Sequence, residues 1–167
     1  MISRSHGPDR EKEIYRERID YEDLLLWSIN NVRMYLQEEK VKKAMQSMKV
    51  LVSLLPQDLR EEFAEKCEND EVISEINKEV LFLEEVKKEL RKYGSHSTIF
   101  HRFIEIFNLN IDPGSIYLKH HIREALPSVE AEVYRKLISR MLSLLIDLLK
   151  EHNLLLRARS RFQGIVP

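Results

Sequence analysis

Residues 133–149 have the sequence VYRKLISRMLSLLIDLL, and between Met141 and Leu149 only Ser143 and Asp147 interrupt the apolar side chains. The apolar residues recur at steps of three and four, which is the spacing of one face of an α-helix. They form two adjacent stripes, one with Val133, Leu137, Met141, Leu144 and Leu148, and the other with Tyr134, Ile138, Leu142, Leu145 and Leu149. A helix that is apolar on most of its surface is either the central element of a core or an interface. This stretch therefore predicts a long C-terminal helix at the centre of the fold.

The same helical spacing recurs towards the N-terminus. One apolar stripe covers residues 25–36, a second covers residues 41–55, and the two are out of phase across residues 38–40. This change of phase predicts a turn and hence an αα-hairpin, which Pro56 ends. Asp20 is the predicted N-cap of the first helix of the hairpin.

Further helices are expected in the middle of the chain. Apolar stripes predict a short helix at residues 59–67, a long helix at residues 73–90 and a phenylalanine-rich helix at residues 100–107. Gly94 is the predicted left-handed C-terminal cap of the long helix.

Two prolines predict the boundaries of the remaining helices. Asp112 and Pro113 fit the N-cap and first position of a helix, which is expected to stop before Pro127. Ser128 is then the predicted N-cap of the last helix.

The composition also favours an all-α fold. The chain has four glycines and a single threonine, Thr98, whereas β-sheet proteins use glycine in turns and threonine in strands. Its 167 residues have room for one domain or two small ones. We predict a single irregular bundle of about six or seven helices over residues 14–156, between a flexible tail at 1–13 and a basic arm at 157–167.

The charge balance and the termini restrict the class of protein. The chain has 27 Lys and Arg against 28 Asp and Glu, which excludes a polybasic nucleic-acid coat and an acidic disordered chain. The N-terminus lacks the apolar core of a signal peptide and no run of about 18 apolar residues occurs, so we expect a cytoplasmic protein without a membrane partner. Abundant Glu and Lys, with few Gln and Cys, are also typical of thermophilic proteins.

No pattern of catalytic residues stands out. Phosphate-binding glycine loops and the GxSxG motif of hydrolases are absent, and Cys67 is the only cysteine. Cys67 continues the apolar stripe of residues 59–67, as a buried structural cysteine would. We therefore expect a protein that is not an enzyme, with no catalytic residue, no cofactor and no small-molecule substrate.

Two pairs of residues are candidate metal ligands. His101 precedes Glu105 by four residues and His121 precedes Glu124 by three, so each pair can share a helical face. The HExxH and ExxH motifs of helical metal sites are absent. We favour a solvated face over a metal site for both pairs.

The expected function is a protein–protein interaction or assembly module. Apolar side chains of the last helix would join this chain to a second copy or to another protein. The candidate interface residues are Met141, Leu144, Leu145 and Leu148. The phenylalanines of residues 100–107 have the same potential, but core packing is the favoured interpretation.

The alternative function is a nucleic-acid-binding regulator. Arg157, Arg159 and Arg161 give the C-terminal arm a charge of +3, and alternation would place them on one side of an extended chain. Lys40, Lys42 and Lys43 form a second basic run at the predicted hairpin. Both groups are candidates for phosphate contacts. The arm could instead meet the acidic residues 57–92 of another subunit, or serve only as solubilising charge.

Overall fold

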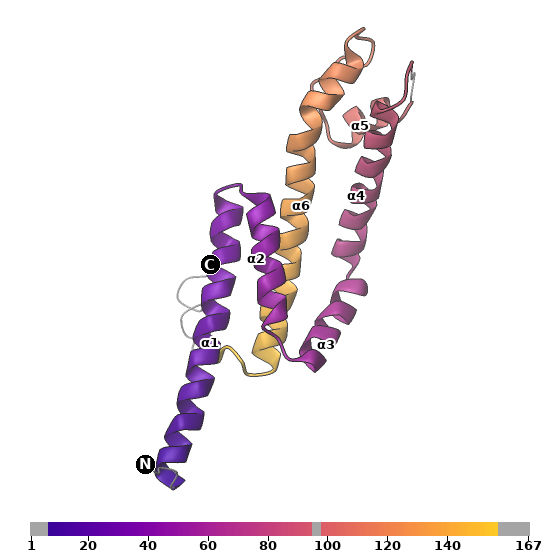
Figure 1. Cartoon of the computed structure of the whole chain (residues 1–167). Helices are drawn as coiled ribbons and strands as arrows, with labels where there is room; N and C mark the ends of the chain where they lie inside the picture. Colours follow the sequence, from indigo (N-terminus) through magenta and orange to yellow (C-terminus); the bar gives the residue numbers. More distant parts are fainter. Residues whose placement is uncertain (1–6, 95–97, 157–167) are drawn as a thin grey trace. The chain divides into compact units, whose positions relative to one another are not determined.

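The computed structural model describes residues 7–94 and 98–156, with side chains from residue 20 onwards. Within these ranges the chain forms six α-helices and no β-strand (Figure 1). The helices are α1 Gly7–Gln37, α2 Val41–Ser53, α3 Gln57–Glu68, α4 Glu71–Leu90, α5 Thr98–Ile106 and α6 Leu118–Glu151. The predicted all-α fold with a long C-terminal helix is confirmed.

The described residues form two compact units. Unit 1 contains residues 7–66 and 141–156, and unit 2 contains residues 67–94 and 98–140. The boundaries fall inside α3 and α6, so each of these helices contributes residues to both units.

The hairpin of α1 and α2 in unit 1 confirms the predicted turn. Glu39 has a φ of 60°, and the amide of Lys40 donates to the carbonyl of Tyr35 over 2.8 Å. The hydroxyl of Tyr21 donates to the carbonyl of Leu54 over 2.8 Å, which ties α1 to the end of α2. The facing sides of the two helices are buried and consist of Leu25, Ile29 and Val32 on α1 and Ala44, Met48 and Leu51 on α2.

The rest of unit 1 comes from α3 and the C-terminal part of α6. His152 Nε2 lies 2.9 Å from Glu62 Oε2, which accepts its hydrogen bond, and Lys66 pairs with Glu151 at 3.5 Å. The apolar side chains beneath these pairs are Leu59, Phe63, Leu142, Leu145, Ile146, Leu148 and Leu149.

In unit 2, α4 runs antiparallel to the N-terminal part of α6. Glu79 of α4 pairs with Lys136 of α6, and Lys87 of α4 pairs with Glu130 of α6. The later residue of α4 therefore meets the earlier residue of α6, as in an antiparallel pair. Phenylalanines of α5 complete the core. Its buried members are Ile76, Leu83, Val86, Leu90, Phe100, Phe103, Ile104, Ile122, Leu126, Val129 and Val133.

The predicted start of the first helix and the predicted C-terminal cap of the long helix at residues 73–90 differ from the structure. The first helix begins at Gly7 rather than at Asp20, so it includes residues 7–13, which we had assigned to the tail. Gly94 has the expected positive φ of 60°, but α4 already ends at Leu90, and Arg91 is its C-cap.

Pro127 does not interrupt the last helix. Asp112 begins a turn, with its Oδ1 accepting from the amide of Gly114 at 2.9 Å, and α6 then runs from Leu118 to Glu151. The predicted break before Pro127 and the cap at Ser128 are therefore wrong. A proline inside a helix costs about 3 kcal/mol, whereas full burial of one large aliphatic side chain stabilises by about 2 kcal/mol. Burial of Ile122, Leu126, Val129 and Val133 on both sides of Pro127 outweighs that cost.

Candidate functional site

The basic residues predicted at the hairpin lie together at its tip. Lys40 precedes α2 and pairs with Glu38 at 3.7 Å, and the Lys43 ammonium lies 5.9 Å from the centre of the Tyr35 ring. Lys42 is exposed in the first turn of α2. The other predicted group, Arg157, Arg159 and Arg161, lies outside the described residues.

The candidate interface residues on α6 are covered to different degrees. Leu145 and Leu148 have no exposed surface and belong to the core of unit 1. Met141 and Leu144 are partly buried. The apolar surface of α6 in this region is therefore largely used within the chain.

The histidine pairs do not assemble a metal site in the described part of the chain. Glu124 pairs with His120 at 2.9 Å rather than with the predicted His121, and His101 is exposed. Among residues 20–94 and 98–156, no group of three or more His, Cys, Asp or Glu side chains could hold a metal ion. No helix among the described residues is long and apolar enough to cross a membrane.

Cys67 is partly buried rather than fully buried. Burial, together with the nearby charge of Asp70, raises the pKa of its thiol. The thiolate is the reactive form of cysteine, so both effects disfavour a nucleophilic role.

The outer face of α1 carries large apolar side chains that the chain leaves exposed. Trp27, the only tryptophan, is 63% exposed, and Leu24 and Met34 are each 42% exposed. At 100° per residue, Trp27 and Met34 lie within about 20° of each other and opposite the buried stripe of Leu25 to Val32. One side of α1 is therefore committed to the core of unit 1, and the other presents an apolar surface.

Between residues 24 and 37 this outer face has no charged side chain, whereas Asp20 and Asp23 carry charge on the same side of α1 just before it. Residues 24–37 read LLLWSINNVRMYLQ and contain one charged residue, Arg33, in a chain that is 33% charged. Arg33 is half-buried and its burial lowers the pKa of the guanidinium. We define the outer face of α1 as Leu24, Trp27, Asn30, Asn31, Met34 and Gln37. A solvated helix face normally carries charges, so the composition of the outer face is that of an interface core.

The structure holds the backbone of this face in place. The opposite side of α1 is packed against α2, and the Tyr21 hydroxyl bonds to Leu54 near the start of the outer face. Burial raises the pKa of the Tyr21 phenol, so it stays a neutral donor at ordinary pH.

We did not predict the outer face from the sequence, although a signal was present. Leu24, Trp27 and Met34 recur at helical spacing, but we assigned only the neighbouring stripe, from Leu25 to Leu36, and took it as the core side. The depletion of charge over residues 24–37 was the additional signal that the helix has two apolar sides.

No family model, no curated protein and no solved structure matches this chain. Its function is therefore inferred from its own surfaces.

Proposed function

We propose that this chain is an assembly module that forms a dimer through the outer face of α1. The observation that carries the proposal is the exposure of Trp27, Leu24 and Met34 on a helix face that has no charged side chain between residues 24 and 37. Contiguous exposed apolar surface marks interaction sites, and tryptophan and methionine are enriched in the cores of interfaces.

A second copy is the partner that suits this face. In a symmetric dimer a residue near the two-fold axis meets its own counterpart, so a charge there would repel itself. The centre of the outer face holds Asn30 and Asn31, whose amides both donate and accept hydrogen bonds. An asparagine can therefore pair with an asparagine of the other copy.

An antiparallel pairing of two α1 helices matches the sequence best. With the axis between Asn30 and Asn31, Trp27 of one copy faces Met34 of the other, because both lie equally far from the axis. A methionine sulfur beside an aromatic ring is a favourable contact. The same pairing brings the acidic start of the face, near Asp20, towards the tip of the partner's hairpin with Lys40.

Sedimentation velocity at increasing protein concentration tests the dimer. The wild type is expected to shift from monomer to dimer, and Trp27→Glu to remain monomeric, because a carboxylate would be desolvated in the interface. Leu81→Glu is the matched control: Leu81 is 66% exposed on α4, outside the outer face, and its substitution should leave the dimer intact.

A charge-pair variant tests the antiparallel geometry. In Trp27→Glu/Met34→Lys, opposite charges face each other only if position 27 meets position 34 of the other copy. We expect this variant to recover part of the dimerisation that Trp27→Glu loses, and to lose it again at high salt. A wild type that stays monomeric at all concentrations would overturn the proposal, and no recovery in the double variant would overturn the antiparallel pairing.

A further inference from the structure

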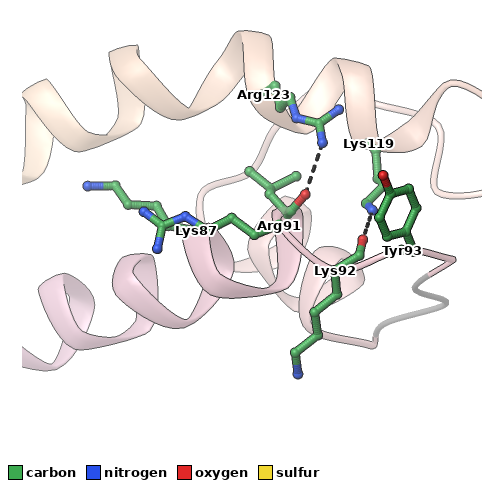
Figure 2. A pocket seen from close by; sticks show the side chains of 7 residues that line it. Lys87, Arg91, Lys92, Tyr93, Lys119 and Arg123 are labelled. Carbon is green, nitrogen blue, oxygen red and sulfur yellow. Dashed lines mark hydrogen bonds between the residues drawn. The ribbon is translucent and has the colours of Figure 1, made fainter.

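A basic cavity of about 550 Å³ lies at the C-terminal end of α4, within unit 2 (Figure 2). Acidic and basic residues are nearly equal in number in this chain, yet the cavity lining contains five cations and no carboxylate. The lining residues are Lys87, Leu90, Arg91, Lys92, Tyr93, Lys119 and Arg123.

Two of the cations reach the cavity from α6 and bind the end of α4. Arg123 Nη2 donates to the carbonyl of Leu90 over 2.9 Å, and Lys119 Nζ donates to the carbonyl of Lys92. The last carbonyls of a helix have no partner within the helix and carry its partial negative charge, so the contact of Arg123 with Leu90 stabilises the helix end. A guanidinium has five N–H donors and an ammonium three, so both groups keep donors for a ligand.

The cations at the end of α4 and in the residues after it differ in whether a carboxylate pairs with them. Lys87 pairs with Glu84 and Glu130, and Lys92 pairs with Glu89 at 3.3 Å. Arg91 is exposed, and its side chain has no ion pair or hydrogen bond to any residue within 20–94 or 98–156. Arg91 is thus the cation of the cavity that is most available to an anion.

Tyr93 adds an aromatic surface at the edge of the cavity. Its side chain is fully exposed, with a relative accessibility of 102%. Figure 2 shows its ring at the same end of the cavity as the ammonium of Lys119, which donates to the Lys92 carbonyl. Exposed aromatic rings next to cations are the surfaces on which proteins stack unpaired bases while binding the neighbouring phosphates.

We propose that this cavity binds single-stranded nucleic acid, with separate phosphates of the strand held by Arg91 and by Arg123 and an unstacked base on the ring of Tyr93. Small ligands are usually buried over most of their surface, whereas Arg91, Tyr93 and Arg123 are all exposed, which suits a strand that crosses the site. A duplex hides its base faces and would leave Tyr93 without a role. The site lies in unit 2 and does not depend on the outer face of α1.

Fluorescence anisotropy with a labelled oligothymidylate and a labelled oligouridylate tests the site. The full-length wild type is expected to bind the single strands more tightly than a duplex of the same length. For Arg91→Gln, loss of one phosphate contact should reduce the slope of log affinity against log salt by about 0.7. Lys88→Gln removes an exposed charge from the same helix outside the cavity and is the matched control.

The contribution of the ring is tested separately. Tyr93→Ala should weaken binding of the single strand by about 5- to 100-fold, whereas Tyr93→Phe, which keeps the aromatic face, should bind nearly as the wild type does. Tyr117→Ala, at a tyrosine that is 64% exposed and does not line the cavity, is the control. Because Arg91 and Tyr93 are exposed, circular dichroism should show that each variant is folded.

Three results would overturn this assignment. The first is no binding of either oligonucleotide at low salt. The second is equal affinity for duplex and single strand together with full affinity in Tyr93→Ala, which would indicate contacts to phosphate alone. The third is displacement of the strand by inorganic phosphate at a concentration equal to that of the phosphate groups of the oligonucleotide. This result would indicate a site for a small anion.

Discussion

Arg140 of α6 donates two hydrogen bonds, of 2.7 and 3.0 Å, to the carboxylate of Asp70, the N-cap residue of α4. Asp70 also caps α4, since its Oδ2 accepts from the amide of Ile73 at 3.0 Å. One carboxylate therefore joins the start of α4 to a residue 70 positions later in the chain, within unit 2. The hydrogen bonds from Arg140 and, to a smaller extent, the bond from the amide of Ile73 lower the pKa of Asp70 to about 2.

This pair predicts how stability depends on pH. The ordinary pKa of Asp70 is 3.8, and its pKa in the folded chain is about 2. Because the folded value is the lower one, the contribution of Asp70 is complete above about pH 4 and is lost as the pH falls towards 2. Asp70→Asn should unfold at a lower temperature at pH 7 and lose less stability than the wild type between pH 4 and 2.

Thermal unfolding followed by circular dichroism across this pH range measures the difference. Asp147→Asn, at an exposed aspartate of α6, is the control and should retain the pH profile of the wild type. Identical profiles for Asp70→Asn and the wild type would show that Arg140 and Asp70 do not interact in solution.

The continuity of α6 makes Pro127 a destabilising residue. Pro127→Ala restores an amide that can bond to the carbonyl of Arg123 and removes the ring from the helix interior. Allowing for the more flexible unfolded chain, we expect the free energy of unfolding to rise by about 2 kcal/mol in urea titrations. If a new helix began at Ser128 instead, the substitution would lower the stability or leave it unchanged.

A substitution at Leu145 distinguishes a role of α6 in core packing from a role in an interface. Leu145 is completely buried, so Leu145→Ala should reduce the free energy of unfolding by about 2–5 kcal/mol, whereas Leu144→Ala, at a partly buried neighbour, should cost less. Urea unfolding at a fixed protein concentration measures both. A Leu145→Ala protein of normal stability and altered oligomeric state would assign Leu145 to an interface.

Ser28 is a buried group whose removal should be tolerated. Its side chain is 3% exposed, and its Oγ has no hydrogen-bond partner among the described residues. An unsatisfied buried hydroxyl costs about 1–3 kcal/mol, and alanine is the better helix former. Ser28→Ala should therefore raise the melting temperature, while Ser53→Ala, at an exposed serine, should change it little. A clear loss of stability in Ser28→Ala would indicate a partner for Oγ in solution.

The local pattern of apolar residues predicted most of the fold. The phase change at residues 38–40 placed the hairpin, and Phe100 and Phe103 are buried as their spacing indicates. The prediction failed at Pro127, because the tendency of proline to end a helix is local. The burial of Ile122 and Val133, which opposes it, depends on tertiary packing.

The two surfaces differ in how far the sequence could have predicted them. The outer face of α1 is continuous in sequence, so the spacing of Trp27 and Met34 and the lack of charge were sufficient to find it. The basic cavity combines Arg91 and Tyr93, which follow the end of α4, with Arg123 of α6. Their proximity depends on the antiparallel packing of α4 and α6, which no local pattern specifies.

The fluorescence of Trp27 tests the dimer most directly, because Trp27 is the only tryptophan and its exposed side chain lies on the outer face. As the protein concentration rises, we expect its emission maximum to move to shorter wavelength, as the exposed indole becomes buried against Met34 of a second copy. Met34→Glu should keep the emission of an exposed indole at every concentration. Emission that is independent of concentration in the wild type, or a shift that persists in Met34→Glu, would contradict dimerisation through the outer face of α1.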